Sequence, residues 1–364
     1  MPGVAATLQS RECILRILII TDLWHPTVNG TVRMMEEVKR QLEQSGHQIA
    51  VIGPERFQTK PFPGDPEILI AIQPEGTIGR MMLEARPEAI HIATAGPIGA
   101  AARNILTARR VPFTTAFLTR SPEYMQARFD IPLERTYANL RAFHAPSRCV
   151  MVPSAGIIAE LKARKFGDNL KLWWAGTDTE LFRPRDKGFL DLPRPIHLNV
   201  GRVTIEKNLE AFLGLDLPGS KLVVGDGPER ARLQERFPDV HFVGTKQGEE
   251  LARHYAAADV FVFPSRTDTL GLVMMEALAS GLPVAAFPVT GPNEVIGDSG
   301  AGVLDEDLGK AIDAALRIDP VRCRAHAMQF SWARSARDFL ALLAPFHVVP
   351  AGAPGPGDAP DLLN

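Results

Sequence analysis

Short apolar runs alternate along the chain with longer segments in which apolar residues recur at helical spacing. Residues 260–263 and 283–287 are rich in branched and aromatic side chains, which is typical of strands buried on both faces. Between them, residues 272–280 are rich in Leu, Met and Ala, and Gly281 follows where a glycine commonly ends a helix. This order predicts two parallel strands joined by a helix that packs on the sheet.

The same alternation begins near the amino end and continues through the sequence. Residues 17–20 and 49–52 are predicted strands, and residues 31–44 between them carry apolar side chains at the spacing of a one-sided helix. This is the opening βαβ unit of a doubly wound sheet. Further strands are predicted at residues 68–72, 89–92, 112–116, 150–152, 170–174, 197–200, 221–224 and 240–243. Further helices are predicted at residues 99–109, 135–143, 154–165, 249–257, 319–328 and 331–343.

Length and composition favour two α/β domains. A chain of 364 residues, 45% hydrophobic and 23% charged, suits two globular domains of ordinary composition. Residues 182–195 are dense in Pro and charge and show no periodicity, so we expect domains at 1–184 and 185–330. Residues 346–364 are rich in Pro, Gly and Ala and are expected to be disordered.

The charge balance and the cysteines exclude several classes of protein. A net charge of -2 gives no reason to expect nucleic acid as a partner. Residues 1–184 carry 22 Lys and Arg against 18 Asp and Glu, a weak basic bias that would suit anionic lipid. Three scattered cysteines indicate neither a disulfide framework nor a zinc site, and they favour a reducing cytosol. The apolar run at residues 14–20 contains Arg16 and is too short to cross a bilayer.

Two acidic residues interrupt the apolar stretch that surrounds the 272–280 helix. Asp268 lies in the loop before this helix and Glu276 lies within it, between strands predicted to be buried. Ligands of open α/β sheets bind at the carboxyl ends of the strands, where Asp268 is expected. The alternative is structural: Asp268 caps the helix and Glu276 bonds to backbone in the core.

Arg202 and Lys207 follow the predicted strand at residues 197–200, at the start of an expected helix. Two cations beside free helix N–H groups form a suitable diphosphate site, although a solvated surface charge is the ordinary fate of a lysine. Glu206, between them, is expected to cap a helix or form an ion pair. Asn29-Gly30 after the first strand is a turn signal, and a dinucleotide fingerprint is absent. The triplet at 305–307 resembles a D-x-D metal motif but precedes a helix, so we predict a helix cap and no bound metal.

The sequence around these two acidic residues resembles that of a known family. The stretch VFVFPSRTDTLGLVMMEALASGLPVAAFPVTG closely resembles the E-x7-E segment of glycosyltransferase family 4, retaining enzymes of the GT-B fold. Asp268 stands at the first Glu of that motif and Glu276 at the second. Arg202 and Lys207 in GRVTIEK match the family's diphosphate-binding pair. The resemblance implies two Rossmann-like parallel-sheet domains facing a cleft, with a helix at residues 331–345 crossing back to the first domain.

The resemblance also implies roles for individual residues. Arg202, Lys207 and Asp268 are the expected catalytic residues. Glu276 would hold the ribose of a nucleotide sugar, and Asp268 would hold the donor sugar. Donor-binding backbone is expected at Gly30, Thr269, Leu270, Gly271 and Gly244, the last beginning a loop that faces the base.

Three positions depart from a bacterial subgroup that the chain resembles almost end to end. Ala95 stands where HIATEGP has Glu, and Leu118 stands where YHTRFPEY has His. Ala175 replaces a common Arg. The subgroup's His lies beside the donor sugar, and a leucine side chain can neither donate nor accept a hydrogen bond.

The sequence therefore predicts a retaining glycosyltransferase. The expected donor is UDP-glucose, UDP-glucuronate or GDP-mannose, and the expected acceptor is diacylglycerol or a related lipid at the cytoplasmic face of the plasma membrane. No cofactor is expected. Two alternatives stay open: a soluble transferase acting on small molecules or polysaccharide precursors, and a nucleotide-sugar-binding relative silenced by the Ala95 and Leu118 departures.

Overall fold

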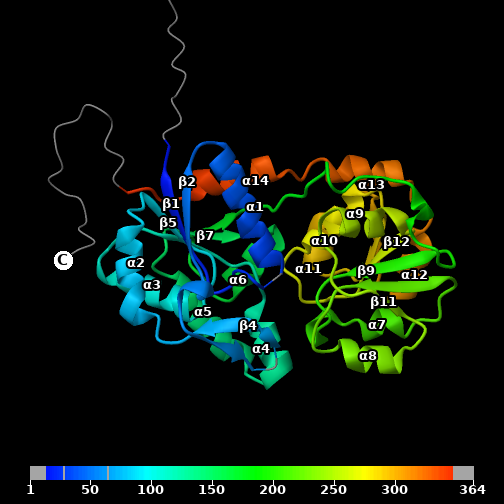
Figure 1. Ribbon diagram of the computed structural model, residues 1–364, viewed down its shortest axis with the longest axis horizontal. Helices are drawn as coiled ribbons and strands as arrows, with labels where there is room; N and C mark the ends of the chain where they lie inside the picture. Colours follow the sequence, from blue (N-terminus) through cyan, green and yellow to red (C-terminus); the bar gives the residue numbers. More distant parts are fainter. Residues whose placement is uncertain (1–13, 28, 64, 347–364) are drawn as a thin grey trace, which may run out of the picture.

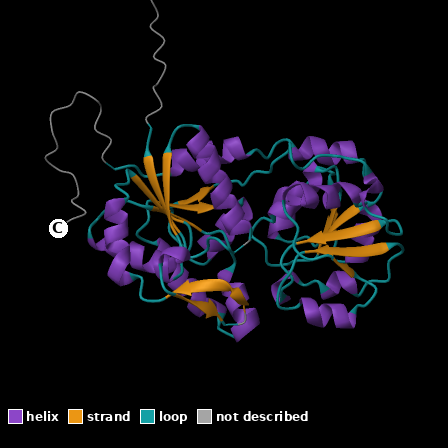
Figure 2. Ribbon diagram, in the orientation of Figure 1, coloured by secondary structure: helices purple, strands orange, loops and turns teal. Residues whose placement is uncertain are grey.

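The chain forms two parallel sheets, each flanked by helices on both faces (Figure 2). The computed structural model describes residues 14–27, 29–63 and 65–346. In Figure 1 the elements of the first sheet, blue to green, lie apart from those of the second, green to orange. The predicted GT-B architecture of two doubly wound α/β domains is confirmed.

The first sheet has the strand order β2-β1-β5-β6-β7-β8, with every neighbouring pair parallel. Its strands are β1 (Arg16–Ile20), β2 (Gln48–Ile52), β5 (Ala89–Ile92), β6 (Thr114–Ala116), β7 (Cys149–Val152) and β8 (Leu170–Leu172). The second sheet has the order β11-β10-β9-β12-β13-β14, again parallel throughout. Its strands are β9 (Ile196–Val200), β10 (Ser220–Val224), β11 (His241–Phe242), β12 (Val260–Phe263), β13 (Val284–Ala286) and β14 (Gly302–Leu304).

Helices connect these strands and cover the faces of both sheets. In the first domain they are α1 (Gly30–Gln44), α2 (Glu75–Glu84), α3 (Pro97–Ala108), α4 (Ser121–Phe129), α5 (Leu133–His144) and α6 (Ala155–Ala163). After β9 they are α7 (Glu210–Leu213), α8 (Arg230–Arg236), α9 (Gly248–Ala257), α10 (Leu272–Ala279), α11 (Thr290–Val295), α12 (Leu308–Ala315), α13 (Pro320–Ala327) and α14 (Trp332–Leu342). Short 3₁₀ turns are η1 (Pro54–Arg56), η2 (Lys187–Phe189) and η3 (Ile205–Lys207).

One predicted strand lies outside the parallel sheets. The segment expected at residues 68–72 falls in β4 (Asp65–Ala71), which pairs antiparallel with β3 (Thr59–Phe62) as a separate hairpin. Most of its residues are partly exposed, as in a hairpin that is not covered on both faces. The expectation of unbroken α/β alternation was therefore wrong here, and helices α2 and α4 were not predicted.

The last helix packs against the first domain although it follows the second in sequence. In Figure 1, α14 lies beside α1. Phe339 of α14 is fully buried, with its ring centroid 4.9 Å from that of His91 and 5.1 Å from that of Trp173. The Trp173 indole N–H donates to the Ser335 carbonyl at 3.0 Å. Phe346, at which the expected tail begins, is buried and donates its N–H to Glu88, and residues 347–364 lie outside the described residues.

We predict that Phe339→Ala destabilises the first domain by about 3–5 kcal/mol, because it removes a fully buried aromatic ring from this contact. All four tryptophans of the chain lie in the first domain or on α14, so denaturant unfolding followed by tryptophan fluorescence reports on that domain. Val321→Ala, at a residue 71% exposed on α13, is the control and should leave the midpoint unchanged. Equal midpoints for the two variants would show that α14 does not stabilise the first domain.

Candidate functional site

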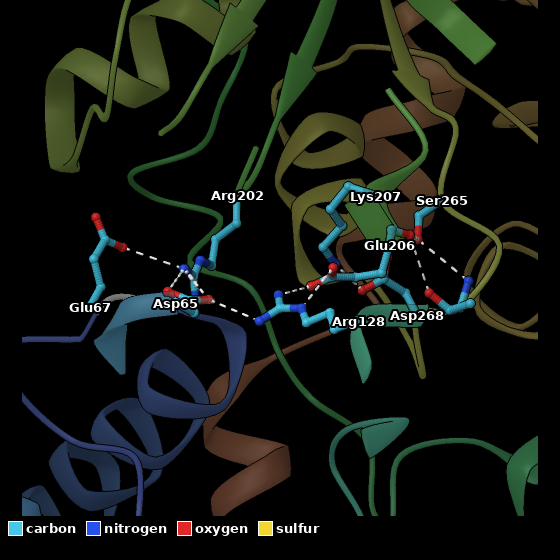
Figure 3. Close-up of polar contacts among 9 residues, drawn as sticks. Asp65, Glu67, Arg128, Arg202, Glu206, Lys207, Ser265 and Asp268 are labelled. Atoms are coloured by element: carbon cyan, nitrogen blue, oxygen red, sulfur yellow. Dashed lines mark hydrogen bonds and ion pairs between the residues drawn. The ribbon is translucent and has the colours of Figure 1, made fainter. Parts of the chain in front are cut away.

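The predicted cation and acid of the second domain meet at the carboxyl ends of neighbouring strands. Lys207 ends η3, which follows β9, and Asp268 lies in the loop between β12 and α10. Because β9 and β12 are adjacent in the sheet, their following loops converge. The Lys207 Nζ lies 2.5 Å from Asp268 Oδ1 (Figure 3). Asp268 Oδ2 is buried and accepts no hydrogen bond from the described residues, so this oxygen is available to a ligand hydroxyl.

Electrostatics keeps Lys207 charged in this environment. Burial disfavours the ammonium, but Asp268 and its hydrogen bond outweigh burial and raise the pKa of Lys207 above its ordinary value. Burial also raises the pKa of the nearby Tyr124 to about 12, so its phenol stays protonated at neutral pH. The pair therefore holds a charged ammonium at the carboxyl ends of β9 and β12.

Arg202 is paired with an acid of the other domain. Its Nη2 lies 2.6 Å from Asp65 Oδ1 and 2.7 Å from Asp65 Oδ2, and Asp65 begins β4 of the hairpin (Figure 3). The Asp65 side chain is 0% exposed, and Arg128 Nη1 contacts it at 3.2 Å. A carboxylate between two guanidinium groups occupies the kind of position that a phosphate oxygen would take.

A second interdomain pair lies next to the first. Arg128 of α4 donates from Nη2 to Glu206 Oε1 of η3 at 2.6 Å (Figure 3). The prediction that Glu206 forms a cap or an ion pair is thus confirmed as an ion pair. The expected helix start at Arg202 and Lys207 was wrong, because η3 intervenes and α7 begins only at Glu210.

Glu276 also makes an interdomain contact. Its side chain is 5% exposed, and Oε1 lies 2.5 Å from Arg33 Nη2, on α1 of the first domain. The Tyr255 hydroxyl, on α9, donates to Glu276 Oε2 at 2.8 Å. The alternative of backbone bonding in the core is therefore wrong for this side chain.

The loop between Asp268 and Glu276 presents mainly backbone. Gly271 has a φ of +88°, and an added Cβ would lie 2.7 Å from Met274 Cε, so the turn into α10 requires glycine. Leu270 is buried in the core, which leaves only its backbone for a ligand. The Thr269 hydroxyl donates to the Leu118 carbonyl of the first domain at 2.8 Å. The Leu118 backbone therefore contacts the loop for which donor binding is predicted.

Gly30 and Gly244, both predicted donor-binding residues, lie in different domains. Gly30 begins α1 behind the Asn29 cap, and a Cβ on it would lie 3.8 Å from Leu272 at the start of α10. Gly244 has a φ of +73°, and its carbonyl accepts from the Gly225 N–H at 2.9 Å. The amino end of α1 thus faces α10 across the domain boundary, and Gly244 lies by the turn that follows β10.

The other two departures occupy different surroundings. Ala95 is exposed in a turn held by Asp22, whose Oδ2 accepts from the Gly96 N–H at 2.9 Å. Ala175 is buried after β8.

The D-x-D triplet at residues 305–307 caps a helix, as predicted. Asp307 caps α12 by accepting from the Lys310 N–H at 3.2 Å.

Sequence reasoning missed Arg33, Asp65, Arg128, Tyr124 and Tyr255. Arg33 carried a usable signal, since it lies one helical turn after Gly30. Asp65 and Arg128 come from the hairpin and from α4, neither of which was predicted.

Comparison with known proteins gives the family. Residues 28–181 match the model described as Glycosyltransferase Family 4, and residues 194–318 match the model described as Glycosyl transferases group 1. Together these matches take in more than half of the chain. Among the described residues, no helix is long and apolar enough to cross a bilayer.

Similar proteins cover most of the chain. Sulfoquinovosyl transferase SQD2 of Arabidopsis thaliana is 29% identical over 76% of this chain, which spans 60% of that protein. A GDP-mannose-dependent alpha-mannosyltransferase of Mycobacterium tuberculosis is 28% identical over 80% of this chain and 84% of its own. An alpha-monoglucosyldiacylglycerol synthase of Acholeplasma laidlawii is 24% identical over 74% of this chain and 79% of its own.

The solved structure of sucrose-phosphate synthase from Thermosynechococcus elongatus superimposes with a TM-score of 0.72 at 22% identity, covering 90% of this chain and 98% of that one. This likeness shows the fold. The two matched family models, the two parallel-sheet domains and the relatives agree: the chain is a GT-B glycosyltransferase and belongs to glycosyltransferase family 4.

Proposed function

We propose that this protein transfers a hexose or uronic acid, with retention of configuration, from a nucleotide-diphosphate sugar to a lipid hydroxyl such as that of diacylglycerol. The observation that carries the proposal is the Lys207–Asp268 pair. A fixed cation lies 2.5 Å from an acid whose other oxygen is buried and accepts no hydrogen bond from the described residues. A sugar hydroxyl would satisfy that oxygen beside a cation suited to the phosphate.

In this mechanism Lys207 and Arg202 take up the negative charge that develops on the leaving diphosphate. The bond from the anomeric carbon to the diphosphate oxygen breaks, and a bond to the acceptor oxygen forms. The acceptor proton passes to the leaving diphosphate. Asp268 orients the sugar, and Glu276 binds the ribose hydroxyls. Two protein cations fill the charge-neutralising role here, so no metal is part of the proposal.

Contact across the domain boundary supports a closed site for the reaction. Thr269 bonds to Leu118, and Gly30 lies against the start of α10. The donor loop and the first domain therefore meet where an acceptor bound to the first domain would approach the sugar. Closure of this kind excludes water, which would otherwise compete with the acceptor.

The proposal of a lipid acceptor rests on sequence similarity to relatives with lipid-related names. Relatives named as a sulfoquinovosyl transferase and as alpha-monoglucosyldiacylglycerol synthases resemble this chain over about three quarters of its length. The mannosyltransferases among the relatives keep GDP-mannose among the candidate donors. We infer a protein that works at the cytoplasmic membrane face. If vesicles do not change the rate of transfer, the protein is instead a soluble transferase of small acceptors.

Leu118 favours one further candidate, a relative that binds the donor nucleotide without turnover. Its side chain packs against the core, while its backbone carbonyl accepts from Thr269. The family's histidine at this place would offer a polar group beside the donor sugar, and leucine offers none.

We expect labelled glycolipid when the purified full chain meets radiolabelled UDP-glucose, UDP-glucuronate and GDP-mannose in turn, with diacylglycerol vesicles present. Product from one donor names the sugar and establishes the transfer. If labelled product forms only when a soluble acceptor replaces the vesicles, the protein is the soluble transferase of small-molecule or polysaccharide acceptors. Nucleotide binding without product from any acceptor would favour the silenced relative.

We predict that Glu276→Ala weakens binding of UDP or GDP by roughly tenfold to a hundredfold, since hydrogen bonds to a buried carboxylate are lost. Isothermal titration calorimetry gives the dissociation constant. Glu235→Ala, at an exposed glutamate on α8 of the same domain, is the matched control. Unchanged affinity in Glu276→Ala would remove Glu276 from the donor site.

We predict that Leu118→His raises the turnover rate by about tenfold or more, because it restores a polar group beside the donor sugar. The rate is measured with the donor that the wild-type protein uses, or with each donor in turn if the wild type is inactive. The nucleotide dissociation constant should change little. A rate equal to that of the wild type would show that the lost histidine does not limit catalysis.

A further inference from the structure

Arg33 extends from the first domain to the acid expected to hold the donor ribose. It lies one turn into α1, three residues after Gly30, and its Nη2 contacts Glu276 Oε1 at 2.5 Å. Glu276 belongs to α10 of the second domain. This ion pair therefore joins the two halves of the molecule at the donor site.

The Glu276 carboxylate is held from two sides. Its side chain is 5% exposed, so an ionised carboxylate there needs a compensating charge and hydrogen bonds. Arg33 supplies the charge at one oxygen, and the Tyr255 hydroxyl donates to the other at 2.8 Å. Burial raises the pKa of Tyr255 well above its ordinary value, so the phenol remains a donor. Each carboxylate oxygen can accept two hydrogen bonds, which leaves acceptor capacity for a diol.

Arg33 is the more exposed member of the pair. Its side chain is 36% exposed, and its Nη2 makes the contact with Glu276. The charge of Glu276 outweighs burial and raises the pKa of Arg33, so the guanidinium stays charged. A ligand that reaches Glu276 would therefore pass beside a cation contributed by the opposite domain.

We propose that Arg33 is a positioning residue for the nucleotide donor: it fixes the Glu276 carboxylate so that both ribose hydroxyls can donate to it. This inference rests on the proposed function, because it takes Glu276 as the ribose-binding acid. Binding of the ribose then depends on contact between the domains, since the two side chains come from opposite sides of the cleft.

A purely structural role for Arg33 predicts something different. An interdomain clamp that only stabilises the closed arrangement would affect every nucleotide alike, whether or not the sugar carries hydroxyl groups. A positioning role affects only ligands with the ribose diol. Comparison of UDP with 2′,3′-dideoxy-UDP, or of the GDP pair if the protein prefers guanine, separates the two roles.

The test measures dissociation constants of both nucleotides by calorimetry for the full-length wild type, Arg33→Met, Arg33→Lys and Glu276→Gln. The wild type should prefer UDP over the dideoxy form. Arg33→Met should weaken UDP binding by roughly tenfold to a hundredfold and leave the dideoxy form almost unchanged, so that the preference disappears. Arg33→Lys retains a cation and should recover part of the preference. In a Glu276→Gln background, Arg33→Met should have little further effect.

Arg40→Met is the matched control, since Arg40 lies on the same helix and pairs with Glu37 at the surface. It should leave both dissociation constants unchanged, and thermal melting checks that every variant folds. Equal weakening of both nucleotides in Arg33→Met would overturn the positioning role while the proposed function stands. A wild type that binds no UDP or GDP would instead overturn the proposed function, and the inference with it.

Discussion

Pairing of opposite charges between the two domains is the interaction on which the site depends. Arg33 meets Glu276, Arg202 meets Asp65, and Arg128 meets both Asp65 and Glu206. Asp65 and Glu276 are almost fully buried, and charges so placed require partners. These charges are therefore balanced before any ligand binds. Arg33–Glu276, Arg202–Asp65 and Arg128–Glu206 each join the two domains, whereas Arg128–Asp65 lies within the first.

This balance links ligand binding to the arrangement of the domains. A diphosphate bound as proposed would bring negative charge to Arg202, which already holds Asp65 at 2.6 Å and 2.7 Å. The phosphate oxygens and the Asp65 carboxylate are alternatives for the same guanidinium, so a donor that takes Arg202 releases a contact to the hairpin. Lys207 differs, because its partner Asp268 belongs to the same domain and is itself a predicted donor contact. The two cations thus carry the same charge, but Arg202 is paired with the other domain and Lys207 with its own.

Whether the sequence alone predicts a residue of the site depends on the element of the fold that carries the residue. Lys207 and Asp268 were predictable because buried strands are visible in the apolar pattern, and loops at the carboxyl ends of adjacent strands converge. Arg33 was within reach, as it follows Gly30 on a helix with a clear period. Asp65 and Arg128 were not, because a half-exposed hairpin and the short helix α4 leave weak patterns, and only tertiary packing brings them to Arg202. Periodicity predicts which face is buried, but it carries no information on which distant charges will meet.

Leu118 shows why binding and turnover must be considered separately. The backbone carbonyl of this residue accepts from Thr269, and any residue could supply that contact. The side chain is what distinguishes leucine from the family's histidine, and it packs against the core without a polar atom. Leucine therefore keeps the backbone contact with the loop, while it lacks the polar group that the family's histidine would offer beside the proposed sugar. In the proposed function, donor affinity depends on other groups, namely Lys207, Asp268 and Glu276. Any change in activity caused by the leucine should consequently appear in the rate of transfer, where charge develops, and not in the affinity for the nucleotide.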